Sequence, residues 1–210
     1  MKRRRKREDA FGLVELTVVL GAVVIIFLLL FAFLTQSRVR SGGIQCVNNL
    51  KHLGLAARIF ASANTNLYPG ELLSGTNAAV LDAAGYFRMM QGEIGTPKIL
   101  VCPDDQKRTW TNNFAALGPR NISYFANLAA SATNPAAFLY GDDHLQLGTN
   151  RITSGLLTIS SNSPMSWTPE RHNGGGNIAM ADGSVHQFDT PLLQKHLPSS
   201  GISSNVLVFP

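Results

Sequence analysis

Carboxylate and imidazole side chains occur close together at two places in the second half of the sequence. Asp142, Asp143 and His144 are consecutive, and His172 is separated from Asp182 by nine residues. Such groups can form an acid–base pair or bind a metal. Neither place has a defining metal-binding spacing such as His-Glu-x-x-His, so we expect no catalytic residue and no bound metal.

Calcium is the cation that would suit these carboxylates, because it takes oxygen ligands, often from loops, and Asp142, Asp143 and Asp182 lie in or beside loop-like segments. The residues define no complete coordination set, however. The alternative is structural. In it, Asp182 and Gly183 form the tight turn of a β-hairpin, and His172 hydrogen-bonds to the backbone of this hairpin. We favour the structural role and expect no cofactor.

The two cysteines, Cys46 and Cys102, lack the paired spacing of a structural zinc site, so coordination of a metal by thiolates is not expected. Both follow the apolar N-terminal segment and lie on the same side of any membrane. A disulfide between them would stabilise an exported domain by about 4 kcal/mol, because it closes a long loop. The alternative is two separate buried thiols.

Motifs of the common enzyme classes do not occur in the sequence. It has no Gly-x-Ser-x-Gly elbow, no phosphate-binding loop and no dinucleotide fingerprint. A catalytic set built from scattered residues stays open as an alternative, but no specific pattern supports it. We therefore expect that the protein is not an enzyme.

An uncharged apolar segment, Leu16–Leu34, follows a run of six basic residues at positions 2–7. Its nineteen residues would form a helix of roughly 28 Å, close to the thickness of a bilayer's hydrocarbon core. The basic run predicts a cytoplasmic N-terminus and an extracytoplasmic remainder. A secretory signal peptide is the competing interpretation, but the segment is long and is followed by no small-residue cleavage site.

The positive charge of the chain is concentrated in that basic run. The formal net charge is +5, from 18 basic and 13 acidic residues. Removing residues 1–10 takes away six basic and two acidic residues, which leaves 12 basic and 11 acidic ones. The remainder is close to neutral, so the charge gives no support to nucleic-acid binding.

Glu15 is an unpaired carboxylate at the start of the apolar segment, where burial is costly and indicates a function or a partner. The alternative is a position in the headgroup layer. The segment Ala-Phe-Gly-Leu-Val-Glu-Leu-Thr-Val-Val-Leu, residues 10–20, resembles the cleavage and methylation segment of type IV prepilins and type II secretion pseudopilins. In that family Gly usually stands where this chain has Ala10.

The resemblance implies that an inner-membrane prepilin peptidase cuts between Ala10 and Phe11 and methylates the new amino group of Phe11. Glu15 then becomes the fifth residue of the mature chain. The family's corresponding carboxylate is held to pair with the N-terminal ammonium of a neighbouring subunit. The pairing is physically reasonable because neither charge is stable alone in an apolar fibre core.

Three further segments resemble a bacterial subgroup of these proteins, named for a His, nine residues and then Asp-Gly. They are the helix-like stretch from Cys46 to Ala56, the dipeptide Tyr68-Pro69, and Val-Cys-Pro-Asp-Asp at residues 101–105. The motif itself is His172 followed by Asp182-Gly183. The resemblance therefore reaches both ends of the chain.

Apolar residues recur at steps of three and four after Gly42-Gly43, which predicts an amphipathic helix that packs on a domain: Ile44, Val47, Leu50, Leu53, Ala57 and Phe60. We expect one helix from about Gly12 to Ala63, with a hinge or kink at the glycine pair. Short alternating runs predict antiparallel strands at residues 121–127, 137–141, 155–159, 177–181 and 184–188, the last two joined by an Asp182-Gly183 hairpin turn. Residues 141–176, apart from 155–159, and 198–205 are expected to be loops.

We therefore predict an α+β protein with a pilin-like arrangement, in which a long N-terminal helix packs on a small antiparallel sheet. Residues 1–10 form a cleaved leader, 11–35 a membrane or fibre-core helix, 36–65 its amphipathic continuation, and 66–210 the extracytoplasmic domain. The expected protein is a single-pass bacterial inner-membrane subunit of a pilus-like or pseudopilus filament. Its partners are the prepilin peptidase and other pilin-like subunits. The alternative is an unprocessed single-span protein that displays a binding or hydrolytic domain.

Overall fold

The computed structural model describes residues 12–73 and 82–210, without the side chains of residues 32–41. The predicted cleavage residues Ala10 and Phe11 lie outside this range. The chain divides into two compact units, Met1–Ser41 and Gly42–Pro210. Each unit is described by itself below.

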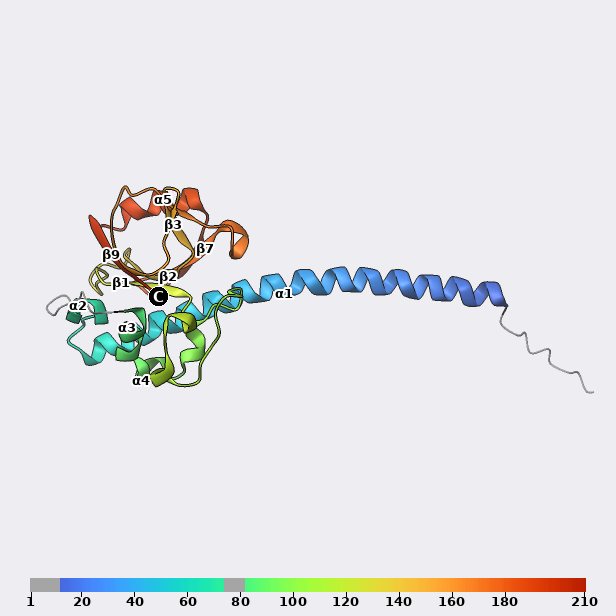
Figure 1. Cartoon of the computed structure of the whole chain (residues 1–210), viewed down its shortest axis with the longest axis horizontal. Coiled ribbons are helices and arrows are strands. Elements are labelled where there is room, and N and C mark those ends of the chain that lie inside the picture. Colours follow the sequence, from blue (N-terminus) through green and yellow to red (C-terminus); the bar gives the residue numbers. More distant parts are fainter. Residues whose placement is uncertain (1–11, 74–81) are drawn as a thin grey trace, which may run out of the picture. The chain divides into compact units, whose positions relative to one another are not determined.

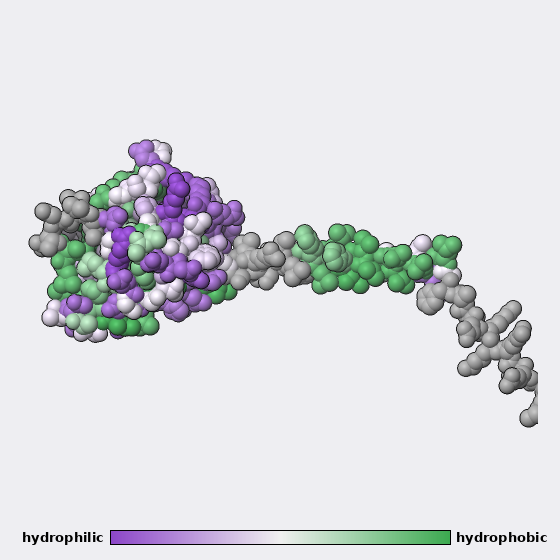
Figure 2. Space-filling view, turned by 60° about the horizontal axis from the view of Figure 1, so that its bottom comes forward, coloured by the Kyte–Doolittle hydropathy of each residue, from purple (hydrophilic) through white to green (hydrophobic). Residues whose placement is uncertain are grey.

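One helix, α1, spans Leu13–Ala63, which confirms the predicted helix. In the first unit, every side chain from Leu13 to Phe31 is exposed, and this 19-residue segment has a mean hydropathy of 2.9. Figure 2 shows it as a mostly hydrophobic surface. By length and composition, this segment is the one helix among the described residues that could cross a membrane.

The second unit contains a six-stranded sheet in which every neighbouring pair is antiparallel, and its strand order is β5-β9-β1-β2-β7-β8. The strands are β1 (Tyr124–Asn127), β2 (Phe138–Asp142), β5 (Gly155–Ser160), β7 (Gly176–Met180), β8 (Val185–Phe188) and β9 (Ser204–Phe209). A helical region with an antiparallel sheet confirms the α+β class.

The central strands β1, β2 and β7 are buried on both faces of the sheet. Successive side chains of a strand point to opposite faces, so each strand contributes to two hydrophobic clusters. Tyr124 and Ala126 of β1 belong to one hydrophobic cluster, and Phe125 between them belongs to the other. The first cluster contains the C-terminal part of α1 together with α3 (Ala83–Met89). The second contains α5 (Thr190–Ser199), which lies on the opposite side of the sheet in Figure 1.

A second sheet of three strands lies with α5 on that opposite side, in the order β4-β3-β6. Its strands are β3 (Leu145–Leu147), β4 (Asn150–Arg151) and β6 (Met165–Trp167). The remaining short helices are α2 (Pro69–Leu73), α4 (Gln91–Ile94), η2 (Pro97–Leu100), η3 (Phe114–Ala116), η4 (Pro119–Asn121) and η5 (His172–Gly174).

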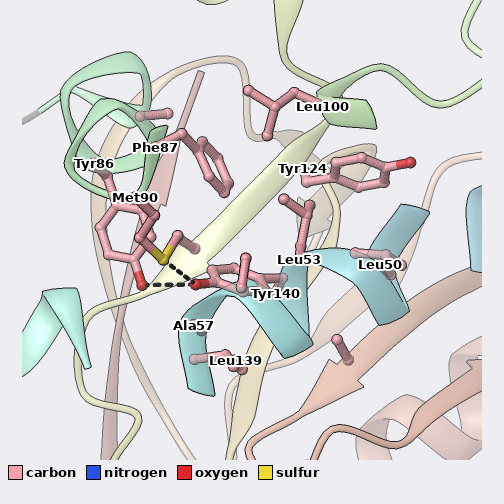
Figure 3. Packing of buried hydrophobic residues seen from close by; sticks show 14 of the residues in the cluster. Leu50, Leu53, Ala57, Tyr86, Phe87, Met90, Leu100, Tyr124, Leu139 and Tyr140 are labelled. Carbon is pink, nitrogen blue, oxygen red and sulfur yellow. Dashed lines mark hydrogen bonds between the residues drawn. The ribbon is translucent and has the colours of Figure 1, made fainter. Parts of the chain in front are cut away.

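Apolar side chains fill the contact of α1 and α3 with the sheet, and a buried polar link joins α3 to the sheet (Figure 3). Leu50 and Leu53 of α1 are fully buried. Close by, the hydroxyl of Tyr140 lies 3.2 Å from that of Tyr86 and 3.5 Å from the sulfur of Met90. These bonds satisfy two hydroxyl groups that would otherwise be costly to bury.

The buried face of α1 begins two residues later than predicted. Ile44 is 64% exposed, whereas Cys46 is fully buried and starts the repeat that continues through Leu50, Leu53 and Ala57. The predicted strands are present as β1, β2, β5, β7 and β8. The prediction of loops at 141–176 and 198–205 is wrong in part, because β3, β4 and β6, the end of α5 and the start of β9 lie there.

The predicted Asp182-Gly183 hairpin is present, but its turn differs in detail. Met180 N–H donates to the carbonyl of Ser184, and Gly183 N–H donates to the carbonyl of Met180. Gly183 has φ +89°, whereas Asp182 is not among the residues with positive φ. The loop is therefore three residues long, and only Gly183 needs the left-handed conformation.

Candidate functional site

Four side chains that can bind a metal converge inside the second unit. They are Cys46 from α1, Cys102 from the loop after η2, Asp142 at the end of β2, and His172 at the start of η5. One ligand atom from each lies within 4.8 Å of the others. We call this group the Cys-His-Asp cluster.

The cluster is sealed from solvent. Cys46, Cys102 and Asp142 are 0% exposed, and the side chain of His172 is 1% exposed. Cys46 Sγ lies 3.4 Å from Asp142 Oδ1, and Cys102 Sγ lies 3.3 Å from His172 Nε2. His172 Nε2 also lies 3.3 Å from Asp142 Oδ2.

A second layer of polar groups holds these side chains in place. Asp104 Oδ2 lies 2.9 Å from His172 Nδ1, on the side of the ring that faces away from the cysteines. Asn177 donates from its backbone N–H to Asp142 Oδ2 at 2.8 Å and from its side chain to both Asp142 and Cys46. The hydroxyl of Tyr124 lies 3.4 Å from Cys46 Sγ.

Buried ion pairs extend from the cluster. The guanidinium of Arg171 contacts Asp105, Asp142 and Asp143, and its own side chain is 4% exposed. Arg108 also contacts Asp143 and Asp105. These partners compensate buried carboxylates that could not stay charged alone.

The backbone at the cluster is in an uncommon conformation. His172 and Asn173 have φ of +52° and +56°, and Gly174 has +79°. Left-handed backbone is unfavourable for residues other than glycine, costs of order 1 kcal/mol or more each, and is concentrated at functional sites. The surrounding contacts therefore hold His172 against a local preference.

The charged neighbours change the acidity of the cluster. Burial would lower the pKa of His172, but Asp142 and Cys102 outweigh burial and raise that pKa to about 10. A hydrogen bond with Cys46 is the largest cause that lowers the pKa of Cys102 to about 7, against burial and with help from His172. Burial raises the pKa of Cys46. Burial would also raise the pKa of Asp142, but His172 and Arg171 hold it below its ordinary value.

The glycine pair of α1 lies beside this site. A Cβ atom at Gly42 would overlap the carboxylate of Asp104, and one at Gly43 would lie 3.9 Å from His172 Nδ1. Both residues remain within the helix. Close approach of Asp104 thus gives a physical reason for glycine at position 42, besides the predicted hinge.

His172 contacts the thiol of Cys102 through Nε2 and the carboxylate of Asp104 through Nδ1. A thiol, a base and a carboxylate that orients the base are arranged in this way where a cysteine acts as a nucleophile. A nucleophile must touch its substrate, and Cys102 is 0% exposed. A cleft of about 630 Å³ borders the site and is lined by Asp104, Asp105 and Arg171 among others, but by neither cysteine. The geometry therefore favours a buried ligand set over a reactive thiol.

Of the residues singled out in the sequence, the structure brings Cys46, Cys102, Asp142 and His172 together and leaves Asp182 elsewhere. Asp182 accepts from Ser184 N–H at 2.8 Å in the hairpin turn. The prediction that His172 bonds to the hairpin backbone is wrong, since its ring contacts the cluster and Asp104. The suggested calcium group of Asp142, Asp143 and Asp182 is not assembled in the described part of the chain.

The argument from spacing against thiolate ligands also fails, because the fold joins cysteines that are far apart in sequence. Both cysteines are free thiols here, and the disulfide between them stays a prediction. Arg171 and Asp104 were missed as site residues. Asp104 lies within the quoted segment 101–105, and Arg171 directly precedes His172, so both were close to residues already singled out.

Comparisons with models of protein families, with curated proteins and with solved structures found no match to this chain.

Proposed function

We propose that this chain is a membrane-anchored structural subunit of a type IV pilus-like or type II secretion pseudopilus-like filament, and not an enzyme. The observation that carries the proposal is the exposed apolar helical segment Leu13–Phe31, whose first residues belong to the segment 10–20 that resembles a prepilin cleavage site. Nothing in the described part of the chain covers this helix. Lipid before assembly and neighbouring helices after it would supply the missing apolar contacts.

The position of Glu15 supports the same proposal. Its carboxylate Oε2 accepts from the backbone N–H of Gly12 at 3.1 Å, in the first turn of α1. A negative charge is favourable there because the helix dipole is positive at its N-terminus. Cleavage after Ala10 would create an ammonium on Phe11, one residue before Gly12. In a filament, Glu15 would exchange its bond to Gly12 for the ammonium of a neighbouring subunit.

Replacement of Glu15 tests the assembly step. Glu15→Ala should leave membrane insertion intact but reduce incorporation into sheared or cross-linked filaments by about tenfold or more, because the neighbour's ammonium loses its partner in an apolar core. Incorporation is measured by immunoblot of the filament fraction against the membrane fraction. Thr17→Ala is the matched control, since Thr17 bonds only locally, to the carbonyl of Val14.

Wild-type incorporation of the Glu15→Ala variant would argue against Glu15 as an assembly residue. A wild-type chain that stays in the membrane as an isolated, full-length species would favour the alternative of an unprocessed single-span protein.

A further inference from the structure

We propose that Cys46, Cys102, Asp142 and His172 bind one divalent zinc-type ion, which fastens helix α1 to the sheet. This inference concerns the second unit alone and does not depend on filament assembly. The donor set is two sulfurs, one imidazole nitrogen and one carboxylate oxygen, supplied by four separate segments of the chain. Zinc in structural sites takes four such ligands in a closed tetrahedral arrangement.

The distances between the donor atoms fit that arrangement. A tetrahedral zinc ion with bonds of about 2.0–2.3 Å keeps its ligand atoms about 3.3–3.8 Å apart. Cys46 Sγ lies 3.4 Å from Asp142 Oδ1, Cys102 Sγ lies 3.3 Å from His172 Nε2, and His172 Nε2 lies 3.3 Å from the other carboxylate oxygen, Asp142 Oδ2. With one ligand atom taken from each residue, all separations are within 4.8 Å. The four ligand atoms therefore lie close enough together that small side-chain shifts would give the spacing of a tetrahedral site.

The surroundings of the cluster are those of metal ligands. A histidine that binds a metal through one ring nitrogen is usually fixed by a carboxylate or carbonyl at the other, and here Asp104 occupies that place at Nδ1. Asn177 bonds to the carboxylate of Asp142 and to the sulfur of Cys46. Donors to a ligand sulfur and carboxylate stabilise the negative charge that these groups carry when they bind a cation.

Two other occupants fit less well. Calcium requires six to eight oxygen ligands, whereas this cluster offers one carboxylate and two sulfurs. A disulfide between Cys46 and Cys102 would remove the S–H group of Cys46 that Asp142 Oδ1 now accepts. Asp142 and His172 would then face sulfur atoms with no charge or donor to offer. Zinc uses all four groups, and each thiol releases its proton on binding.

The position of the four residues in the fold indicates what a bound ion would do. Asp104, which contacts His172, lines the cleft of about 630 Å³ and its side chain is 23% exposed, whereas the four ligand side chains are closed to solvent. Because Cys46 lies on α1 and Asp142 on β2, a bound ion would join the helix to the sheet directly. We therefore assign the ion a structural role.

The test uses the full chain, purified in detergent under reducing conditions without chelators. Elemental analysis should find about one zinc per chain, and native mass spectrometry should show the same protein with one zinc bound. After removal of zinc, added cobalt should give the charge-transfer absorption of cobalt–thiolate bonds. Removal of the ion should lower the unfolding temperature.

Variants separate the proposed ligands from a histidine outside the cluster. Cys102→Ser should abolish the cobalt–thiolate band or weaken it sharply, and His52→Ala, at an exposed position of α1, should leave it unchanged. Asp104→Asn keeps all four ligands and should weaken metal binding by about 10–100-fold, as loss of a group that orients a ligand does.

A wild-type protein that is isolated folded, with reduced thiols, and neither contains zinc nor gives the cobalt band would overturn the proposal. So would a mass lower by two hydrogens together with no metal uptake, which would establish the disulfide instead. These readings come from the wild-type chain, so a variant that fails to fold leaves the test intact.

Discussion

Arg171 contacts the three carboxylates of Asp105, Asp142 and Asp143, and all four side chains are less than a tenth exposed. Charges in such a place are stabilised almost entirely by one another, because little water reaches them. Arg171 comes directly before His172 in the chain, and both side chains contact Asp142. The position of the imidazole and the charge balance of the site therefore depend on the same few residues.

Arg171→Met should reduce the free energy of unfolding by about 3–5 kcal/mol, because it leaves buried carboxylates without their main partner. Arg151→Met is the matched control. Arg151 also pairs with a carboxylate, that of Glu170, but its side chain is 43% exposed. Solvent screens such a pair, so the control should change stability by at most about 1 kcal/mol.

Denaturant unfolding followed by tryptophan fluorescence measures both variants, since Trp167 is buried in the second cluster. Equal losses in Arg171→Met and Arg151→Met would show that burial does not distinguish the two ion pairs.

The residues of the site were visible in the sequence, but their grouping was not. Cys46 and Asp142 are 96 residues apart, and Cys102 and His172 are 70 apart. Spacing rules detect ligands that one turn or one helix brings together, and they do not detect ligands that separate elements bring together. The expectation of no metal followed from that limit.

At the scale of elements, periodicity was the reliable signal. The repeat of three and four predicted α1, and alternation predicted five strands of the main sheet. The strands β3, β4 and β6 were missed for a physical reason: β4 has two residues, and β3 and β6 have three each. Runs so short show no alternation, and their pairing partners rather than their own sequence define them. The six-residue strand β9 was missed as well, and its length does not explain that.

Two nearby leucines of α1, one buried and one exposed, allow a direct comparison of how much each side chain contributes to stability. Leu53→Ala removes a fully buried side chain from the first cluster and should cost about 2–5 kcal/mol. Leu55→Ala changes a side chain that is 57% exposed on the same helix and should change stability by at most about 0.5 kcal/mol. Thermal melting of the two variants in the same detergent measures the difference.

Nearly equal melting temperatures for these two variants would contradict the packing of this face of α1 on the sheet. The control matters because both substitutions are Leu to Ala within one helix, so helix propensity is the same in each.

At the scale of the whole molecule, the two units differ in what they leave exposed. The second unit buries its apolar side chains in two clusters on either side of a sheet. The described side chains of the first unit, Leu13–Phe31, are all exposed and mostly apolar. A chain with such a helix needs a lipid or protein environment to complete its structure. In the proposed function, lipid surrounds this helix before assembly, and neighbouring helices surround it in the filament.

The most direct test of this account is the N-terminal mass of the protein extracted from membranes, compared between cells with and without the prepilin peptidase. The account predicts a peptidase-dependent mature chain that starts at methylated Phe11, with Glu15 as its fifth residue. A chain that keeps residues 1–10 in both kinds of cell would contradict it.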